Sequence, residues 1–104
     1  MVEIYRLVSF LPKDENFVIS QQMRRAAISI PSNIAEGQSR KSKKEFLNFL
    51  SIATGSKSEL ETQLIICCRL KYLKEKQIDT ALKMCDEISK MIYALSEKID
   101  ICEN

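Results

Sequence analysis

The sequence has no histidine and no tryptophan, and it has only two glycines and two prolines among its 104 residues. Without histidine, the Ser-His-Asp type of hydrolytic triad, the mixed Cys/His zinc sites and the Glu-x-x-His iron sites of helical bundles are all excluded. The scarcity of glycine and proline leaves few residues for turns, which predicts a small number of long helices. Alternating runs of β-branched and aromatic residues, which are typical of strands, are also missing.

Other absences concern the compartment and the chemistry. No stretch approaches the roughly 20 apolar residues of a membrane-spanning helix, and residues 1–6 lack a signal-peptide pattern, so we expect no membrane partner and a cytoplasmic location. The four cysteines form no Cys-x-x-Cys pair, so we expect reduced, mostly buried thiols and no metal site. The two glycines stand alone, and no phosphate-binding loop or cofactor is expected. Glu59 and Glu61 lie about 200° apart on a helix, so their carboxylates diverge and do not share one site. We therefore predict no catalytic residues.

The stretch from residue 19 to residue 37 organises the chain. Its apolar residues recur every three or four positions and so share one face of a helix: Ile19, Met23, Ala26, Ala27, Ile30 and Ile34. Pro31 lacks a backbone N–H and its ring collides with the carbonyl of Ala27, which predicts a kink. Ser29, Ser32 and Asn33 are expected to satisfy backbone groups near this kink rather than to react. Gly37 is expected to end the helix in the left-handed conformation.

The remaining pattern completes an all-α fold, an antiparallel up-down four-helix bundle formed as a single domain by residues 1–104. The four helices are predicted at about 2–10, 14–36, 43–73 and 78–102. Asp14 is the expected cap of the second helix, and Ser42 with Glu45 has capping-box spacing before the third. Gly55 is expected to allow close helix approach. In the fourth helix we assign the methionines that widen the apolar seam to the core.

Cations gather between residues 24 and 44, where the only acid is Glu36. The six bases are Arg24, Arg25, Arg40, Lys41, Lys43 and Lys44. Lys43 and Lys44 begin a helix, where the helix dipole disfavours cations, so a merely solvated loop explains this cluster badly. We interpret the six residues as a candidate surface for an anionic partner, either a nucleic-acid backbone or an acidic protein.

The first half of the third helix is apolar over much of its girth. One apolar stripe suffices inside a small bundle, so two apolar faces predict two sets of neighbours. We therefore expect a homo-oligomer in which this helix supplies both core and subunit contacts. The predicted subunit interface consists of Phe46, Leu47, Phe49 and Ile52.

Residues 22–37 (QMRRAAISIPSNIAEG), followed by Glu45-Phe46-Leu47, Gly55-Ser56 and Glu59-Leu60-Glu61, resemble a family of bacterial four-helix bundles. This is the 23S rRNA intervening-sequence protein family, whose relatives include the accessory protein of diversity-generating retroelements. The resemblance covers about Ile4 to Leu73. It implies an up-down bundle that assembles into a homopentameric ring and binds nucleic acid or a reverse transcriptase.

The chain departs from the family pattern at its first helix, roughly half of which has no counterpart here. Either residue 1 is internal to the natural gene product, or the first helix is shortened and leaves a groove open along the other three. Two functions follow. The first is a non-enzymatic oligomeric scaffold that binds RNA or DNA through the basic rim between the second and third helices. The alternative is a protein-protein interaction module, such as an accessory subunit of a reverse transcriptase.

Overall fold

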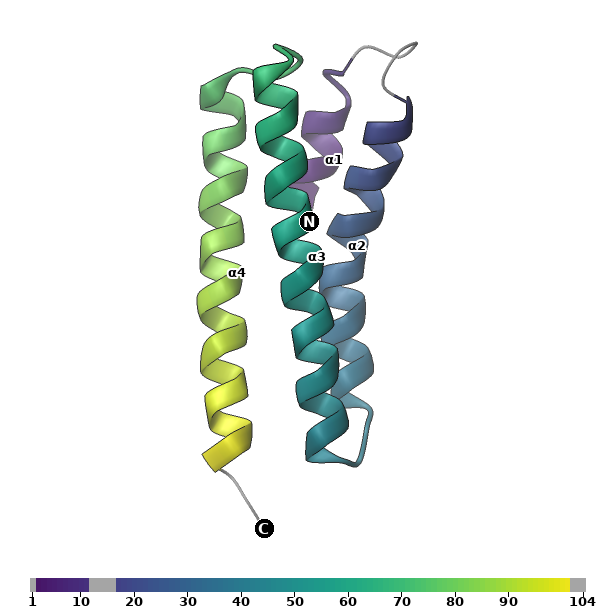
Figure 1. Cartoon of the computed structure of the whole chain (residues 1–104), viewed down its shortest axis with the longest axis vertical. Coiled ribbons are helices and arrows are strands. Elements are labelled where there is room, and N and C mark those ends of the chain that lie inside the picture. The colour runs from purple at the N-terminus through teal and green to yellow at the C-terminus, as the bar shows by residue number, and fades with distance from the viewer. Residues whose placement is uncertain (1, 12–16, 102–104) are drawn as a thin grey trace.

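The computed structural model describes residues 2–11 and 17–101. Its helices are α1 (Val2–Val8), α2 (Phe17–Gln38), α3 (Lys43–Arg69) and α4 (Glu75–Ile101). They run alternately up and down in a rod of 52 × 22 × 18 Å (Figure 1). The described part of the chain contains no strand, so the predicted all-α up-down bundle with a short first helix is confirmed. The predicted cap Asp14 and the end of the apolar seam at Cys102 lie outside the described residues.

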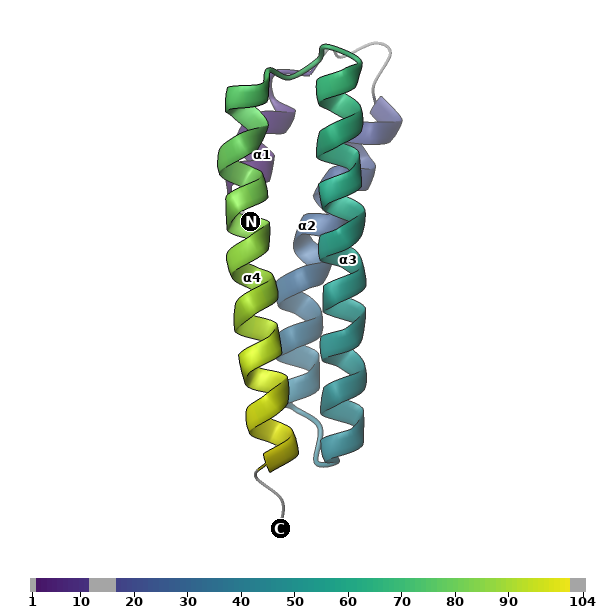
Figure 2. The same ribbon diagram turned by 60° about the vertical axis from the view of Figure 1, so that its left-hand side comes forward.

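The short helix α1 lies beside the upper part of the bundle only, the part that contains the α3–α4 connection (Figures 1 and 2). Its buried residues are Ile4, Leu7 and Val8, and it packs against both α2 and α4. At about 1.5 Å per residue, α1 is about 10 Å long and α4 is about 40 Å long. In the lower part, therefore, no described helix lies between α2 and α4, and these two helices are not in close contact.

The hydrophobic core is correspondingly uneven. The larger buried cluster occupies the upper part, where α1 completes the bundle, and includes Ile4, Leu7, Met23, Ala26, Ala27, Leu60, Leu64, Cys67 and Cys85. The smaller cluster, in the lower part, is formed by Leu50, Ala53 and Ile92. Ala26 and Ala27, two small residues of the predicted apolar face, are almost fully buried.

Neither of the two glycines has the role that was predicted for it. No glycine among the described residues has a positive φ, so Gly37 does not end α2 in the left-handed conformation. A Cβ atom at Gly37 would instead lie 2.9 Å from both Phe46 Cδ1 and Phe49 Cβ, so its missing side chain makes room for two aromatic residues of α3. Around Gly55 a Cβ atom would meet nothing within 4 Å. The predicted close approach at Gly55 is therefore wrong, because this part of α3 faces solvent.

Both ends of α3 have identifiable caps. Ser42 is the N-cap, and its side chain accepts a hydrogen bond from the backbone N–H of Glu45 at 3.2 Å, as predicted. The helix ends four residues earlier than expected, because Lys71 adopts the left-handed conformation with φ 65°. The N–H of Tyr72 donates to the carbonyl of Cys67 at 2.9 Å, which is the six-to-one bond of a Schellman motif. The end of α3 was not predicted, because a lysine occupies the left-handed position that glycine usually marks.

Polar side chains near Pro31 link α2 to α3. The helix continues on both sides of the proline. The amide of Asn33 donates to the carbonyl of Ser29 at 2.8 Å and to its Oγ at 2.9 Å. The Oγ atoms of Ser29 and Ser56, on α3, lie 2.6 Å apart. Asn33 thus bonds a backbone carbonyl near the proline, as predicted, whereas the hydroxyl of Ser29 bonds to the side chains of Asn33 and of Ser56 on a second helix.

Candidate functional site

The six predicted nucleic-acid-binding residues occupy two separate places. Four of them surround the connection between α2 and α3 at the lower end of the rod, and we call them the basic loop: Arg40, Lys41, Lys43 and Lys44. Arg24 and Arg25 lie on α2, about 20 Å above its end at about 1.5 Å per residue. The structure therefore brings four of the predicted cations together and leaves two apart.

Two cations of the basic loop have partners in the chain. The Nη2 atom of Arg40 lies 2.7 Å from the carboxylate of Glu36, and its guanidinium carbon lies 5.0 Å from the ring centre of Phe49. The Nζ atom of Lys43 donates to the backbone carbonyl of Asp100 at 3.2 Å. The last carbonyls of a helix lack helical partners and favour a cation. Lys43 thus contacts the end of α4, which an argument from the dipole of α3 alone did not anticipate.

The other predicted cations are less constrained. The guanidinium carbon of Arg24 lies 6.0 Å from the ring centre of Tyr5 on α1, which is consistent with a cation–π contact. Arg25, Lys41 and Lys44 are exposed. Within the described part of the chain these three form no ion pair or side-chain hydrogen bond. A polyanion that binds these three residues breaks no ion pair or side-chain hydrogen bond of the described part of the chain.

An apolar groove lies between α2 and α4 in the lower part of the bundle. Two hollows of about 210 and 510 Å³ share Ile34, Met91 and Ile92 and so form one continuous groove, which we call the open groove. Its other lining residues are Ile30, Pro31, Ile88, Ala94 and Leu95, with Gln38 and Lys98 as the polar ones. This is the position at which a shortened first helix was expected to leave a groove.

Met91 lines both hollows of the open groove and is 69% exposed. The prediction that the methionines of α4 belong to the core is wrong for this residue, because α1 ends above it and no described helix covers it. Met84 is 36% exposed and also lies at the surface. The spacing of apolar residues along α4 is unbroken from the upper to the lower part, so spacing alone could not show where its neighbour ends.

The residues of the predicted subunit interface mostly contact their own chain. Phe46 and Leu47 pack against the lower cluster. Phe49 is half-buried, with its Cβ atom close to Gly37. Ile52 is 44% exposed and is the member of this set that faces outward. Much of the apolar girth of α3 is therefore used inside one chain, by its contacts with α2 and α4.

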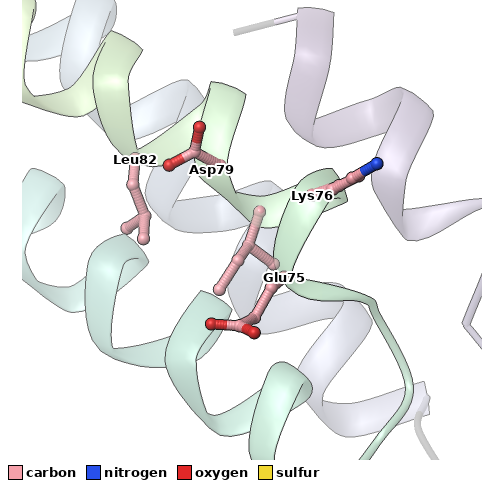
Figure 3. A pocket seen from close by; sticks show the side chains of 5 residues that line it. Glu75, Lys76, Asp79 and Leu82 are labelled. Atoms are coloured by element: carbon pink, nitrogen blue, oxygen red, sulfur yellow. The ribbon is translucent and has the colours of Figure 1, made fainter.

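A third hollow, of about 360 Å³, lies at the start of α4 and is lined by Glu75, Lys76, Ile78, Asp79 and Leu82. Figure 3 shows that the charged groups of Glu75, Lys76 and Asp79 point in different directions, so they do not converge on one ligand. Asp79 also pairs with Lys83 at 3.2 Å. Among the residues that the structure describes, no group of three cysteines or carboxylates is placed to hold a metal ion.

The described cysteines are free thiols placed as predicted. Cys67 and Cys85 are buried, and Cys68 is partly buried. Burial raises the pKa of Cys67, and it raises that of Cys85 to about 11, with a smaller contribution from Glu61. Because the thiolate is the reactive form, these two cysteines are poor nucleophiles and poor metal ligands at neutral pH. None of the described helices is long and apolar enough to cross a membrane.

Comparisons with known proteins identify relatives of the chain. The family model described as 23S rRNA-intervening sequence protein matches residues 1–94. A crystallised protein from Bacteroides thetaiotaomicron is similar in sequence and structure, and it is described as a protein with unknown function from the S23 ribosomal protein family. The two share 31% identity and a TM-score of 0.84, over 91% of this chain and 89% of that one. None of the curated proteins compared with the chain matches it.

Proposed function

We propose that this chain, which belongs to the 23S rRNA-intervening sequence protein family, is a non-enzymatic interaction module that holds a protein partner in its open groove. The exposure of Met91, which lines both hollows of a continuous apolar groove, carries this proposal. Single apolar residues are common on surfaces, whereas contiguous apolar surfaces mark interaction sites. An accessory subunit of a nucleic-acid enzyme, such as a reverse transcriptase, is one role of this kind.

This ranking reverses the order of the two functions that the sequence suggested. The sequence grouped six cations into one rim, but Arg24 and Arg25 are remote from the basic loop. Arg40 and Lys43 each have an internal partner. The lining of the open groove, in contrast, is apolar apart from Gln38 and Lys98 at its lower end.

Nucleic-acid binding through the basic loop is the second candidate, and Lys41 and Lys44 favour it because they are exposed and form no ion pair with any described residue. Residues 36–45 contain four cations and two carboxylates, a formal charge of +2. A single copy is expected to bind RNA or DNA loosely and without sequence preference. A homopentameric ring, with the outward-facing Ile52 in its subunit contacts, repeats the basic loop around one rim and raises avidity without a new contact.

Capture from an extract of the host bacterium separates the two candidates. Immobilised wild-type protein is compared with Met91→Lys in the open groove, with Lys41→Gln/Lys44→Gln in the basic loop, and with Met84→Lys as a surface control outside the groove. We expect Met91→Lys to lose a protein that the other three retain, with little dependence on salt. The basic-loop variant tests for a bound nucleic acid that is released steeply by salt.

Helicity measured by circular dichroism confirms that each variant is folded. If Met91→Lys captures the same proteins as the wild type, the groove function is rejected. If, in addition, the basic-loop variant alone loses nucleic acid, the second candidate takes its place. Sedimentation of the wild type at micromolar concentration tests the ring, because a 12.0 kDa monomer contradicts it.

A further inference from the structure

We infer that the upper end of the rod carries a second interaction surface, which binds an acidic segment of a partner protein that also presents aliphatic side chains. This surface is separate from the open groove, and the inference does not depend on the proposed function. Three features of the structure support it: a group of cations without partners, the positions that these cations occupy, and the exposed aliphatic residues among them.

Cations gather where α3 ends and α4 begins, at the upper end of the bundle (Figure 1). They are Arg69, Lys71, Lys74 and Lys76. Residues 69–76 contain these four cations and one carboxylate, that of Glu75, so their formal charge is +3. All four cations are exposed, and none of them forms an ion pair or a side-chain hydrogen bond with any described residue. Figure 3 shows the amino group of Lys76 directed away from Glu75.

Three of these cations occupy positions that favour other residues. Arg69 lies in the last turn of α3, where the helix dipole favours a cation. Lys71, in contrast, has the left-handed conformation with φ 65°, which glycine adopts with less strain than any other residue. Lys74 and Lys76 lie on either side of Glu75, the first residue of α4, where the dipole disfavours cations. The local stability of the helices does not explain these three lysines, whereas a negatively charged partner does.

Aliphatic side chains are exposed among the cations. Ile65, Ile66 and Leu70 are 44%, 41% and 53% exposed. Together with Arg69 they occupy an arc of about 140° on the side of α3 opposite to its buried residues. We call these three residues and the four cations the upper patch. Aliphatic residues bordered by charges are typical of protein interfaces, which have an apolar core and a polar rim.

The composition of the upper patch favours an acidic protein segment over a nucleic acid. Carboxylates pair with lysine and arginine, and aliphatic side chains of the partner remove Ile65, Ile66 and Leu70 from water. A phosphate backbone neutralises the cations but leaves these residues exposed. Single-stranded bases bind by stacking on aromatic rings, and Tyr72, the only aromatic residue of the stretch 65–76, is partly buried against the larger core cluster. The partner therefore carries aspartate or glutamate beside leucine, isoleucine or valine.

Fluorescence anisotropy with defined probes tests the inference. The main probe is a labelled peptide of about twelve residues that combines glutamates with leucines spaced by three and four positions. A second peptide has serine in place of each leucine, and a third probe is a single-stranded RNA of equal charge. The upper patch is altered by Leu70→Ser and by Lys71→Gly/Lys74→Gln. As matched controls, Lys41→Gln/Lys44→Gln removes the same charge from the basic loop, and Met91→Lys alters the open groove.

We expect the wild type to bind the leucine peptide about tenfold more tightly than the serine peptide, and Leu70→Ser to remove this difference. Lys71→Gly/Lys74→Gln should weaken the binding of both peptides about fivefold, while the two control variants bind them as the wild type does. Lys71→Gly alone should raise the unfolding temperature by about 4 °C, so that its effect on binding is not a loss of folding.

Unchanged binding by the upper-patch variants, or no binding of either peptide at low salt, overturns the inference. Tighter binding of the RNA than of the leucine peptide also overturns it, because the surface then serves a nucleic acid. A lower sedimenting mass of Leu70→Ser than of the wild type shows that a second copy of the chain covers the patch, with the same consequence. If Met91→Lys alone loses the leucine peptide, the upper patch is rejected while the proposed function of the open groove stands.

Discussion

The upper and lower parts of the bundle share α2, α3 and α4 but differ in what closes the gap between α2 and α4. In the upper part α1 closes it, and Met23 is fully buried. In the lower part no described helix does so, and Met91 is 69% exposed. Both methionines lie on the inward side of the apolar pattern of their helices. Whether an apolar residue of this molecule is buried therefore depends on where the neighbouring helix ends. The upper part has a closed core, and the lower part has an open apolar surface.

The same substitution in the two parts gives the largest expected difference. Met23→Ala removes a fully buried side chain that lies beside Cys67, with 3.7 Å between the two sulfur atoms. It should lower the free energy of unfolding by about 2–5 kcal/mol. Met91→Ala, at an exposed position, should change it by less than about 0.5 kcal/mol. Urea denaturation followed by circular dichroism measures both. Equal losses mean that the lower part is as closed as the upper.

A second prediction concerns the place where the lower part is tightly packed. Gly37→Ala puts a methyl group 2.9 Å from Phe46 Cδ1 and from Phe49 Cβ, so α2 and α3 must separate locally. The expected loss of unfolding free energy is about 1–3 kcal/mol, measured by urea denaturation. An unchanged midpoint of the urea transition contradicts the close approach. It means that α2 and α3 are packed loosely at Gly37.

The pKa of Cys85 tests how closed the upper part is. Burial, with a smaller contribution from Glu61, raises this pKa from 9.0 to about 11. Between these pH values the thiol ionises in the unfolded chain but stays protonated in the folded one, so the unfolded state binds fewer protons and stability falls as pH rises. The stability of the wild type relative to Cys85→Ala should therefore decrease from pH 8 to pH 10.5. A constant difference indicates that water reaches Cys85.

The smallest expected effect concerns the solvent-facing side of α3. Gly55 is exposed in the middle of α3, and a Cβ atom there meets nothing within 4 Å. Gly55→Ala should raise the free energy of unfolding by about 0.5–1 kcal/mol, because alanine is the better helix former. Thermal unfolding followed by circular dichroism measures the gain. Destabilisation contradicts the structure and restores the sequence-based role of this glycine in helix packing.

The sequence was sufficient to predict the helices and their order, because spacing by three and four residues and the cap at Ser42 are local signals. It was insufficient wherever the outcome depends on a neighbouring helix. The roles of Gly37 and Gly55 were predicted wrongly because the sequence does not show whether a neighbouring helix approaches a glycine closely. The end of α3 was missed because Lys71 takes a conformation that is usually marked by glycine.

The candidate site was predictable only in part. The resemblance to a family with a longer first helix led to the expectation of a groove, and two of the α2 residues that line it, Ile30 and Ile34, belong to the predicted apolar stripe. The exposure of Met91 was not predicted, because its spacing is that of a core residue. The cations were predicted as one rim because the sequence does not show that Lys43 contacts the carbonyl of Asp100 or that Arg24 lies beside Tyr5.

The hydrogen bond between Ser29 and Ser56 selects one alignment of α2 against α3. Apolar stripes repeat with every turn, so sliding one helix by about 5.4 Å brings similar side chains together again. The two hydroxyls meet at one alignment only. After such a slide the two hydroxyls lose each other as partners in a partly buried place, at a cost of about 1–3 kcal/mol for each group left unsatisfied. This small polar cluster therefore acts against misaligned bundles more than it adds to the stability of the correct one.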